Sequence, residues 1–285
     1  MIGIDIHEPQ SLEEAFALLG GEETTARPFG GGTALMLMMK ARVFQPSSLV
    51  SIARVDPRFH GVTQAPGGAA LTIGAMTTFT TLDRDPLVAE HLPVIREVMV
   101  SLANPRVRNV ATVGGNLAHA DPHLDLPPVW LSLDATVRTI GPAGERSFPV
   151  EELFAGYYET TLRPCELIMQ VHVPLVSGWR RRYVKITTRS AHDWPAVGIT
   201  IGLRVSADRC EDVRLVLSAA TDRPVRLYAA EAALRGRNLN DQVLEEVLEA
   251  AAGETRIESD DRGSAEYKVH LLKVHLKRAL RDMGE

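Results

Sequence analysis

Three consecutive glycines near the start of the chain form the first candidate binding segment, Pro28-Phe-Gly-Gly-Gly-Thr-Ala-Leu35. Adjacent glycines allow successive backbone N–H groups to turn towards one point, where they can neutralise phosphate oxygens without interference from side chains. The segment lacks the GxGxxG spacing of dinucleotide-binding folds and the GxxxxGK[ST] pattern of nucleoside triphosphatases. Taken alone, it fits a diphosphate-binding turn and a merely flexible turn equally well.

A second glycine segment, Thr112-Val-Gly-Gly-Asn116, is followed closely by Asp121-Pro-His-Leu-Asp125. Its amides could again face a phosphate, and its amide and carboxylate side chains can hydrogen-bond sugar hydroxyls. The two segments together could hold the two ends of one extended dinucleotide. The two segments considered together make a more specific prediction than either segment does alone.

The surrounding run from Asn104 to Pro128 resembles a known sequence block. It is similar to the FAD-binding loop of the medium, flavoprotein subunit of carbon monoxide dehydrogenases and of the flavin domain of xanthine dehydrogenases, members of the molybdenum hydroxylase family. Further similarities cover nearly the whole chain in order: residues 30–35, 72–75, 154–157, 166–174, 183–185 and 263–268.

The resemblance implies an α+β fold: an FAD-binding unit of the vanillyl-alcohol oxidase (PCMH) type with two α/β subdomains, and a C-terminal domain of a three-stranded antiparallel sheet and helices. We expect the units at residues 1–55, 56–175 and 176–285. It also implies that FAD contacts Pro28, Phe29, Gly30, Gly31, Gly32, Thr33, Ala34, Leu35, Leu102, Thr112, Val113, Gly114, Gly115, Asn116, Asp125, Ile168 and Lys185. In that set both glycine segments would wrap the diphosphate and Asp125 would bind a sugar hydroxyl. One departure is Gly-Gly-Gly-Thr where many relatives have Gly-Gly-Gln-Ser or Gly-Gly-His-Ser, and threonine keeps the hydroxyl donor.

Lys185 also has an argument of its own. In an alternating strand it shares a face with Tyr183 and Arg181, while Val184 and Ile186 point the other way. A cation beside a flavin would favour the reduced, anionic form. Most lysines are solvated surface residues, so the functional interpretation depends on the resemblance.

Alternating histidines and aspartates suggest a competing interpretation, a metal-dependent hydrolase with ligands at His119, Asp121, His123 and Asp125. Imidazoles and carboxylates suit a divalent cation. The preceding Gly114-Gly-Asn116 and the proline at position 122 fit the flavin loop better than a metal site. No later histidine-rich motif would complete a coordination shell. We therefore expect no metal site here.

The family resemblance implies that FAD takes electrons, one at a time, from a [2Fe-2S] cluster on a small partner subunit and passes them to an external acceptor: NAD, oxygen or a quinone. A large molybdopterin-binding subunit would oxidise the organic substrate. With only two cysteines, Cys165 and Cys210, and no CxxC, this chain cannot hold a four-thiolate cluster itself. The alternatives are a self-sufficient FAD oxidoreductase and a scaffold that has lost its cofactor.

Several elements must position these residues. The alternation of Ile2, Ile4 and Ile6 predicts a short strand, and Ser11 with Glu14 predicts a reciprocally capped helix that ends before Gly20. Residues 24–52 read as a small βαβ unit. Strands are predicted at 70–73, 135–140 and 167–173, a helix from Pro93, and a loop from 104 to 125.

The last third of the chain reads as strands followed by helices. Strands are predicted at 183–186, 197–205 and 213–218, and helices at 229–234, from Asn240 onwards, and at 265–283. The last helix carries a basic stripe, which is either a solvated face or a docking surface for an acidic partner: Lys268, Lys273, Lys277, Arg278 and Arg281.

The composition bounds the function classes. A chain of 285 residues with 45% hydrophobic and 24% charged residues is typical of a globular protein with two or three compact units. A net charge of −5 argues against broad nucleic-acid binding. No apolar run approaches the length of a membrane span. The first residues lack the basic and apolar regions of a secretory signal, so we expect a cytoplasmic protein.

Overall fold

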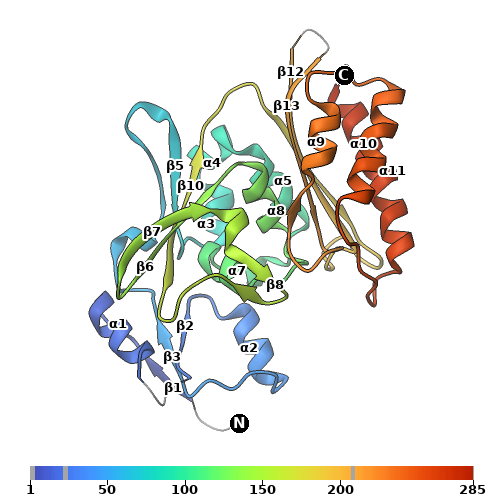
Figure 1. Ribbon diagram of the computed structural model, residues 1–285. Helices are drawn as coiled ribbons and strands as arrows, with labels where there is room; N and C mark the ends of the chain where they lie inside the picture. Colours follow the sequence, from blue (N-terminus) through green and yellow to red (C-terminus); the bar gives the residue numbers. More distant parts are fainter. Residues whose placement is uncertain (1–3, 22–24, 207–208, 285) are drawn as a thin grey trace.

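The computed structural model describes residues 4–21, 25–206 and 209–284 (Figure 1). Its N-terminal unit is a parallel three-stranded sheet in the order β1-β3-β2, with one helix after each of the first two strands. The elements are β1 (Asp5–His7), α1 (Leu12–Leu19), β2 (Arg27–Phe29), α2 (Thr33–Lys40) and β3 (Ser48–Ser51). The predicted βαβ unit is confirmed; Ile2, assigned to the first strand, lies outside the described residues.

The predicted cap of α1 forms, with one change of partner. The Ser11 hydroxyl accepts a hydrogen bond from the amide of Glu14 at 3.2 Å. The Glu14 carboxylate accepts from the amide of Gln10 at 2.8 Å, one residue before the expected donor.

The middle unit contains a five-stranded antiparallel sheet in the order β4-β5-β10-β6-β7. Its strands are β4 (Val62–Gln64), β5 (Ala70–Gly74), β6 (Thr136–Gly141), β7 (Gly144–Pro149) and β10 (Leu167–Pro174). A small hairpin, β8 (Phe154–Gly156) and β9 (Glu159–Thr160), lies beside it. The helices preceding the glycine segment at 112–116 are α3 (Phe79–Arg84), α4 (Pro86–His91) and α5 (Pro93–Ser101), and short 3-10 turns occur at Pro57–Phe59, Pro66–Gly68 and Val150–Leu153.

The stretch predicted as a loop, residues 104–125, instead contains two short helices. These are α6 (Pro105–Arg108) and α7 (Val113–His119), and α8 (Leu126–Ser132) follows. The side chain of Asn104 accepts from the amide of Val107 at 3.1 Å, and Thr112 accepts from that of Gly115 at 3.2 Å. These two N-caps stabilise helices whose glycines and proline suggested a loop.

The C-terminal unit is an antiparallel sheet in the order β11-β12-β13-β14 with three helices. Its elements are β11 (Arg180–Ile186), β12 (Val197–Ser206), β13 (Arg209–Ser218), β14 (Val225–Arg226), α9 (Tyr228–Leu234), α10 (Asp241–Gly253) and α11 (Ala265–Gly284). The three predicted strands and three predicted helices are present, and β14 adds a short fourth strand. Helices α9 and α11 cover one face of the sheet, and α8 of the middle unit packs on the other.

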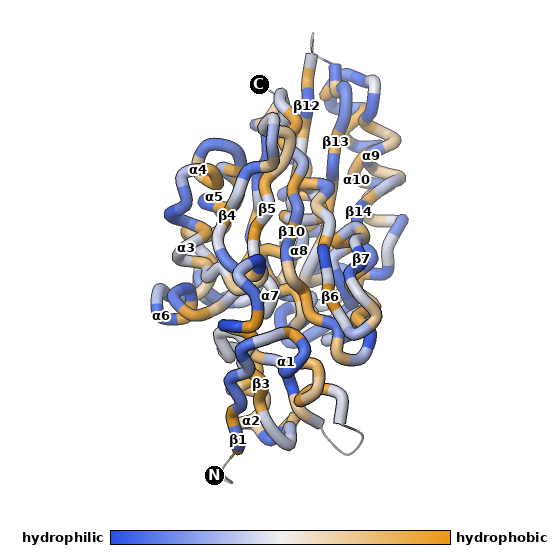
Figure 2. Tube along the Cα trace, turned by 90° about the vertical axis from the view of Figure 1, so that its left-hand side faces the viewer, coloured by the Kyte–Doolittle hydropathy of each residue, from blue (hydrophilic) through white to orange (hydrophobic). Residues whose placement is uncertain are grey.

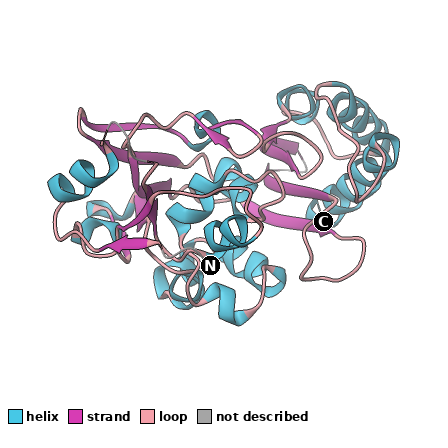
Figure 3. Cartoon of the chain, turned by 90° about the horizontal axis from the view of Figure 1, so that it is seen from below, coloured by secondary structure: helices cyan, strands magenta, loops and turns pink. Residues whose placement is uncertain are grey.

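Two hydrophobic cores result. One runs through the N-terminal and middle units and receives Tyr183 and Val216 from the C-terminal unit, and the other lies between the C-terminal sheet and its helices. Figure 3 shows the C-terminal helices gathered at one end of the molecule, and the two termini lie at opposite ends in Figure 2. Among the described residues, no helix combines the length and the apolar character that crossing a membrane requires.

Candidate functional site

The first glycine segment (residues 28–35) presents a row of unused backbone donors. Pro28 and Phe29 belong to β2, and Gly32, with φ of 68°, turns the chain into α2. Within the described part of the chain, no hydrogen-bond partner is found for the amides of Gly30, Gly31, Gly32, Thr33, Ala34 and Leu35. These donors are half-buried, and the positive end of the α2 dipole adds to their potential. We call these six N–H groups the amide cradle.

The cradle lies against the second glycine segment (residues 112–116). A Cβ atom on Gly31 would stand 1.7 Å from the carbonyl oxygen of Val110, and one on Gly30 would stand 2.9 Å from Oγ1 of Thr112. Only glycine allows this approach at Gly31, because the obstacle is backbone. The two segments therefore border one region of the surface.

The second segment differs from the sequence-based expectation that its amides form a free nest. The amide of Val113 donates to Thr77 and that of Gly114 to Ala75, while those of Gly115 and Asn116 bond to Thr112. Two groups of this segment remain available to a ligand. Gly115 is exposed, and the Oδ1 atom of Asn116 is buried without a hydrogen-bond partner in the described structure. Any ligand contact here would come from these groups.

Gly114 has a packing role. A Cβ atom at this position would stand 2.5 Å from the Cβ of Ala75, so α7 can lie close to the end of β5 only with glycine there.

Asp125 and Lys185 form a buried ion pair, with 3.0 Å between Nζ and Oδ2. The Lys185 side chain is only 6% exposed, so the solvated-lysine interpretation is wrong. Lys185 also donates to the carbonyl of Ser101 at 3.2 Å, and Tyr183 donates its hydroxyl to Oδ1 of Asp125 at 2.7 Å. Burial raises the pKa of Asp125, and the attraction of Lys185 with the hydrogen bond from Tyr183 limits that rise. The sequence placed Tyr183 on the same face as Lys185 but did not indicate this contact.

Leu102 and Ile168 are both buried. Leu102 ends α5 directly after Ser101, and Ala103 follows in a left-handed conformation with φ of 47°. Arg108 donates to the carbonyls of both Leu102 and Ala103 at 2.8 Å, which fixes this turn beside the Asp125–Lys185 pair. Ile168 lies on β10, against which α7 packs.

The histidine–aspartate run does not form one cluster. Asp125 faces Lys185 and Tyr183, whereas Asp121 accepts from Nδ1 of His123 at 3.0 Å and from the Tyr158 hydroxyl at 3.0 Å. Burial alone would raise the pKa of Asp121, but these hydrogen bonds outweigh it and lower that pKa. Within the described ranges, no group of three His, Cys, Asp or Glu side chains is arranged to hold a metal ion.

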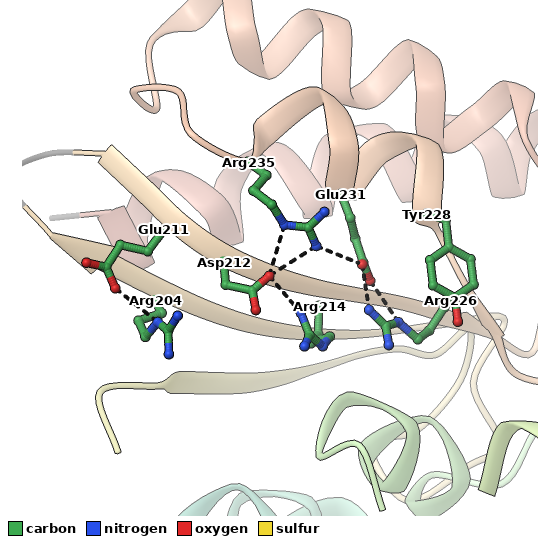
Figure 4. Close-up of a pocket in the computed structure, with 8 residues that line it drawn as sticks. All are labelled: Arg204, Glu211, Asp212, Arg214, Arg226, Tyr228, Glu231 and Arg235. Atoms are coloured by element: carbon green, nitrogen blue, oxygen red, sulfur yellow. Dashed lines mark hydrogen bonds and ion pairs between the residues drawn. The ribbon is translucent and has the colours of Figure 1, made fainter. Parts of the chain in front are cut away.

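A pocket of about 430 Å³ lies elsewhere, on the C-terminal unit (Figure 4). Its cations are internally paired: Arg214 and Arg235 with Asp212, Arg226 with Glu231, and Arg204 with Glu211. A second pocket borders it at Arg226 and Tyr228. Neither is lined by a residue predicted to bind the cofactor.

Comparison with known proteins gives two adjacent family matches. Residues 2–176 match the FAD binding domain in molybdopterin dehydrogenase, and residues 182–283 match the CO dehydrogenase flavoprotein C-terminal domain. The matches together span most of the chain.

Individual relatives agree with these matches. The chain is 32% identical over 279 residues to the carbon monoxide dehydrogenase medium chain of Hydrogenophaga pseudoflava, covering 97% of this chain and 95% of that one. It is 29% identical over 275 residues to the glyceraldehyde dehydrogenase medium chain of Sulfolobus acidocaldarius, covering 96% of each. The fold superposes on the solved carbon monoxide dehydrogenase of Hydrogenophaga pseudoflava with a TM-score of 0.92 at 34% identity, over 98% of this chain and 96% of that chain.

The resemblance and the α+β fold expected from the sequence are thus confirmed. Since both family matches and full-length relatives agree, the chain belongs to the FAD-binding flavoprotein subunits of the molybdopterin dehydrogenases and is an oxidoreductase subunit whose cofactor is FAD.

Proposed function

We propose that this chain holds FAD across its two glycine segments and carries electrons from a [2Fe-2S] subunit to an external acceptor, within a complex whose large subunit binds molybdopterin. The observation that supports the proposal most directly is the amide cradle at residues 30–35, which borders Thr112 and is free to accept a ligand. A row of backbone donors at a helix start suits a diphosphate.

The residues present fit FAD. The cradle would hold the diphosphate, and the buried, unpartnered Oδ1 of Asn116 could accept a hydrogen bond from the cofactor. Leu102 and Ile168 would provide apolar contact. Lys185 uses two of its three N–H groups on Asp125 and Ser101, so one N–H remains for the cofactor.

Bound FAD supplies the capacity to take up electrons singly and release them in pairs. The chain itself contributes grip, orientation and local charge. Its two cysteines, Cys165 and Cys210, cannot supply the four thiolates of a Cys-ligated iron–sulfur cluster, which supports an electron donor on another polypeptide. The relatives named above are each a medium chain, which supports small and large partner subunits.

The substitution Gly115→Val tests the placement of the cofactor. A Cβ atom at Gly115 would stand 2.8 Å from Oγ1 of Thr112, so the variant should disturb the exposed start of α7. We expect FAD retention, measured from the absorption spectrum and flavin content of the purified chain, to fall at least tenfold, while the helical circular dichroism of the C-terminal unit persists.

Gly253→Val is the matched control, because a Cβ atom there meets nothing within 4 Å. It should retain FAD like the wild-type chain. Stoichiometric flavin in the Gly115→Val variant would contradict the proposed placement. Iron analysis of the chain purified with and without its co-expressed neighbours would show which polypeptide carries the cluster.

A further inference from the structure

The loop at residues 120–125, between α7 and α8, is bonded to the C-terminal unit at three separate places. The amide of Ala219, after β13, donates to the carbonyl of Pro122 at 3.0 Å. Nε2 of His123 lies 3.2 Å from Oδ2 of Asp260, in the segment before α11. Asp125 accepts from Tyr183 and Lys185 of β11. Three segments of the C-terminal unit that are distant from one another in the sequence thus contact residues 120–125.

A buried lysine joins two of these places. Lys268 is 1% exposed, and its Nζ lies 2.8 Å from Oδ2 of Asp260 and 3.3 Å from the carbonyl oxygen of Ala219. Because a fully buried ammonium group is costly without partners, Lys268 depends on this arrangement as much as it supports it. The prediction that Lys268 belongs to an exposed basic stripe is wrong for this residue.

The backbone around the loop is held in an unfavourable conformation. Ala120, Tyr158 and Ala219 are left-handed, with φ of 51°, 55° and 64°. Tyr158 donates its amide to the carbonyl of Ala120 and its hydroxyl to Asp121, both at 3.0 Å. Non-glycine residues adopt this conformation at a cost, which persists only where surrounding contacts determine it.

We propose that residues 120–125 form a positioning loop through which the C-terminal unit sets the geometry of the flavin site, with His123, Asp260 and Lys268 as positioning residues. The loop connects the end of α7, which begins with the second glycine segment, to Asp125, which orients Lys185. The three residues act through the loop and need no contact with the cofactor. The inference depends on the proposed function, since it assigns the loop a role in FAD binding.

The His123 imidazole is the central element of this contact. Its Nδ1 lies 3.0 Å from Oδ1 of Asp121 and its Nε2 lies 3.2 Å from Oδ2 of Asp260, so the ring bridges the two carboxylates. The ring also stacks on Trp194, with centroids 5.8 Å apart. Phenylalanine at this position keeps the stacking and removes both hydrogen bonds, while Asp121 retains Tyr158 and Asp260 retains Lys268.

The experiment compares the full-length chain with its His123→Phe variant. Loss of a hydrogen bond to a charged group corresponds to about a tenfold change in an equilibrium constant or more. We therefore expect amide hydrogen exchange in residues 120–126 to quicken about tenfold without FAD, and the FAD dissociation constant, measured by flavin fluorescence, to rise about tenfold. His119→Phe is the control: His119 contacts Tyr158 and Asp121, and no contact with the C-terminal unit is found for it in the described structure.

Asp260→Asn provides a second measurement that a general loss of stability would not reproduce. Asp260 also pairs with Lys268, so Asp260→Asn has an effect of its own. If His123 and Asp260 act through one contact, the double variant should still weaken FAD binding by clearly less than the product of the two single effects, whereas independent effects would multiply. Multiplying effects, or exchange and affinity in His123→Phe within twofold of wild type, would overturn the inference. Failure of the wild-type chain to bind FAD would instead contradict the proposed function, and the exchange measurement would still test the contact.

Discussion

Asp125 and Lys185 depend on each other because both are buried. The side chain of Asp125 is 10% exposed and that of Lys185 is 6% exposed, and only Tyr183, Ser101 and the pair itself satisfy their charges within the described structure. Removal of one member of a buried pair commonly destabilises a protein by about 3 to 5 kcal/mol, since the other charge remains buried alone.

Lys185→Met should therefore destabilise the chain in a pH-dependent manner. Burial already raises the pKa of Asp125, and without Lys185 that pKa should rise further. A carboxyl that binds its proton more tightly in the folded than in the unfolded state makes stability fall as pH increases above the unfolded pKa. We expect a loss of about 3 kcal/mol at pH 7 and a smaller loss at pH 4.5, measured by urea unfolding of the FAD-free chain.

The double variant Lys185→Met, Asp125→Asn tests that explanation. With the carboxylate replaced by a neutral amide, much of the stability at pH 7 should return, and the dependence on pH should disappear. An equal loss at both pH values in the single variant would show that packing of the lysine stem, rather than the unpaired carboxylate, causes the effect.

Residue types suggested the two glycine segments as candidates, but they could not predict the contacts that these segments make within the chain. The close approach of Gly31 to Val110 could not be derived from the sequence, because it depends on two segments that meet only in the folded chain. For the same reason, the sequence predicts free amides in the Thr112 segment, whereas Ala75 and Thr77, in the turn after β5, accept two of them. The predicted cofactor contacts themselves remain predictions.

At the scale of elements, the sheet of the middle unit contains a buried acid that is stabilised by hydrogen bonds. Glu166, just before β10, accepts from Arg146 of β7, from Thr139 of β6 and from the amide of Arg163. Burial alone would raise its pKa, but these hydrogen bonds lower the pKa to about 2. The carboxylate thus connects both strands of the β6–β7 hairpin to the start of β10.

Glu166→Gln should lower the stability of the sheet at neutral pH. A depressed pKa contributes stability that is present above the unfolded pKa and is lost as pH falls towards 2. After allowance for screening at the partly exposed Arg146, we expect the variant to be about 2 kcal/mol less stable at pH 7. The difference between variant and wild type should shrink as pH decreases below 4, which acid titration of the circular dichroism signal would measure.

Glu145→Gln is the control on the same sheet. Glu145 pairs with Arg58 and Arg138, but its side chain is 35% exposed, so its loss should change stability by less than about 1 kcal/mol. A pH-independent loss in Glu166→Gln would contradict the assigned role of the charge.

Helices α10 and α11 show that the charge pattern of one helix does not identify what its charged face contacts. The basic stripe of α11 faces an acidic stripe of α10, and Lys273, Lys277 and Arg281 pair with Glu249, Glu245 and Asp241 respectively. The sequence offered a solvated face or an acidic partner, and the partner in the structure is the preceding helix. Local periodicity predicted both helices, but not their relative orientation.

At the scale of the whole molecule, the middle and C-terminal units are joined by polar contacts around α8. Asp134, just after this helix, accepts from Nε of Arg214 with both oxygens at 3.0 Å, and from Arg226 at 3.1 Å. Arg181 lies nearby: burial lowers its pKa to about 10, and the attraction of Asp134 opposes that shift. The sequence predicted the individual strands and helices. It could not predict this contact, because Asp134 lies 80 positions from Arg214 and 92 positions from Arg226 along the chain.

Asp134→Asn should weaken this connection without altering the backbone, because asparagine tolerates the left-handed conformation found here, with φ of 51°. Arg181, Arg214 and Arg226 would lose a shared negative charge. Because the Asp134 side chain is 41% exposed, solvent screens part of this attraction, and we expect a loss of about 1 kcal/mol. Since the two hydrophobic cores are distinct, the C-terminal unit should then unfold before the rest, which would appear as a second transition in calorimetry.

Asp282→Asn is the control. Asp282 forms an exposed pair with Arg182, so this variant should leave the calorimetric trace unchanged. A single transition at the wild-type midpoint in Asp134→Asn would mean that the other contacts between the two units hold them together without Asp134: the bonds of residues 120–125 to the C-terminal unit and the packing of α8 against β12 and β13.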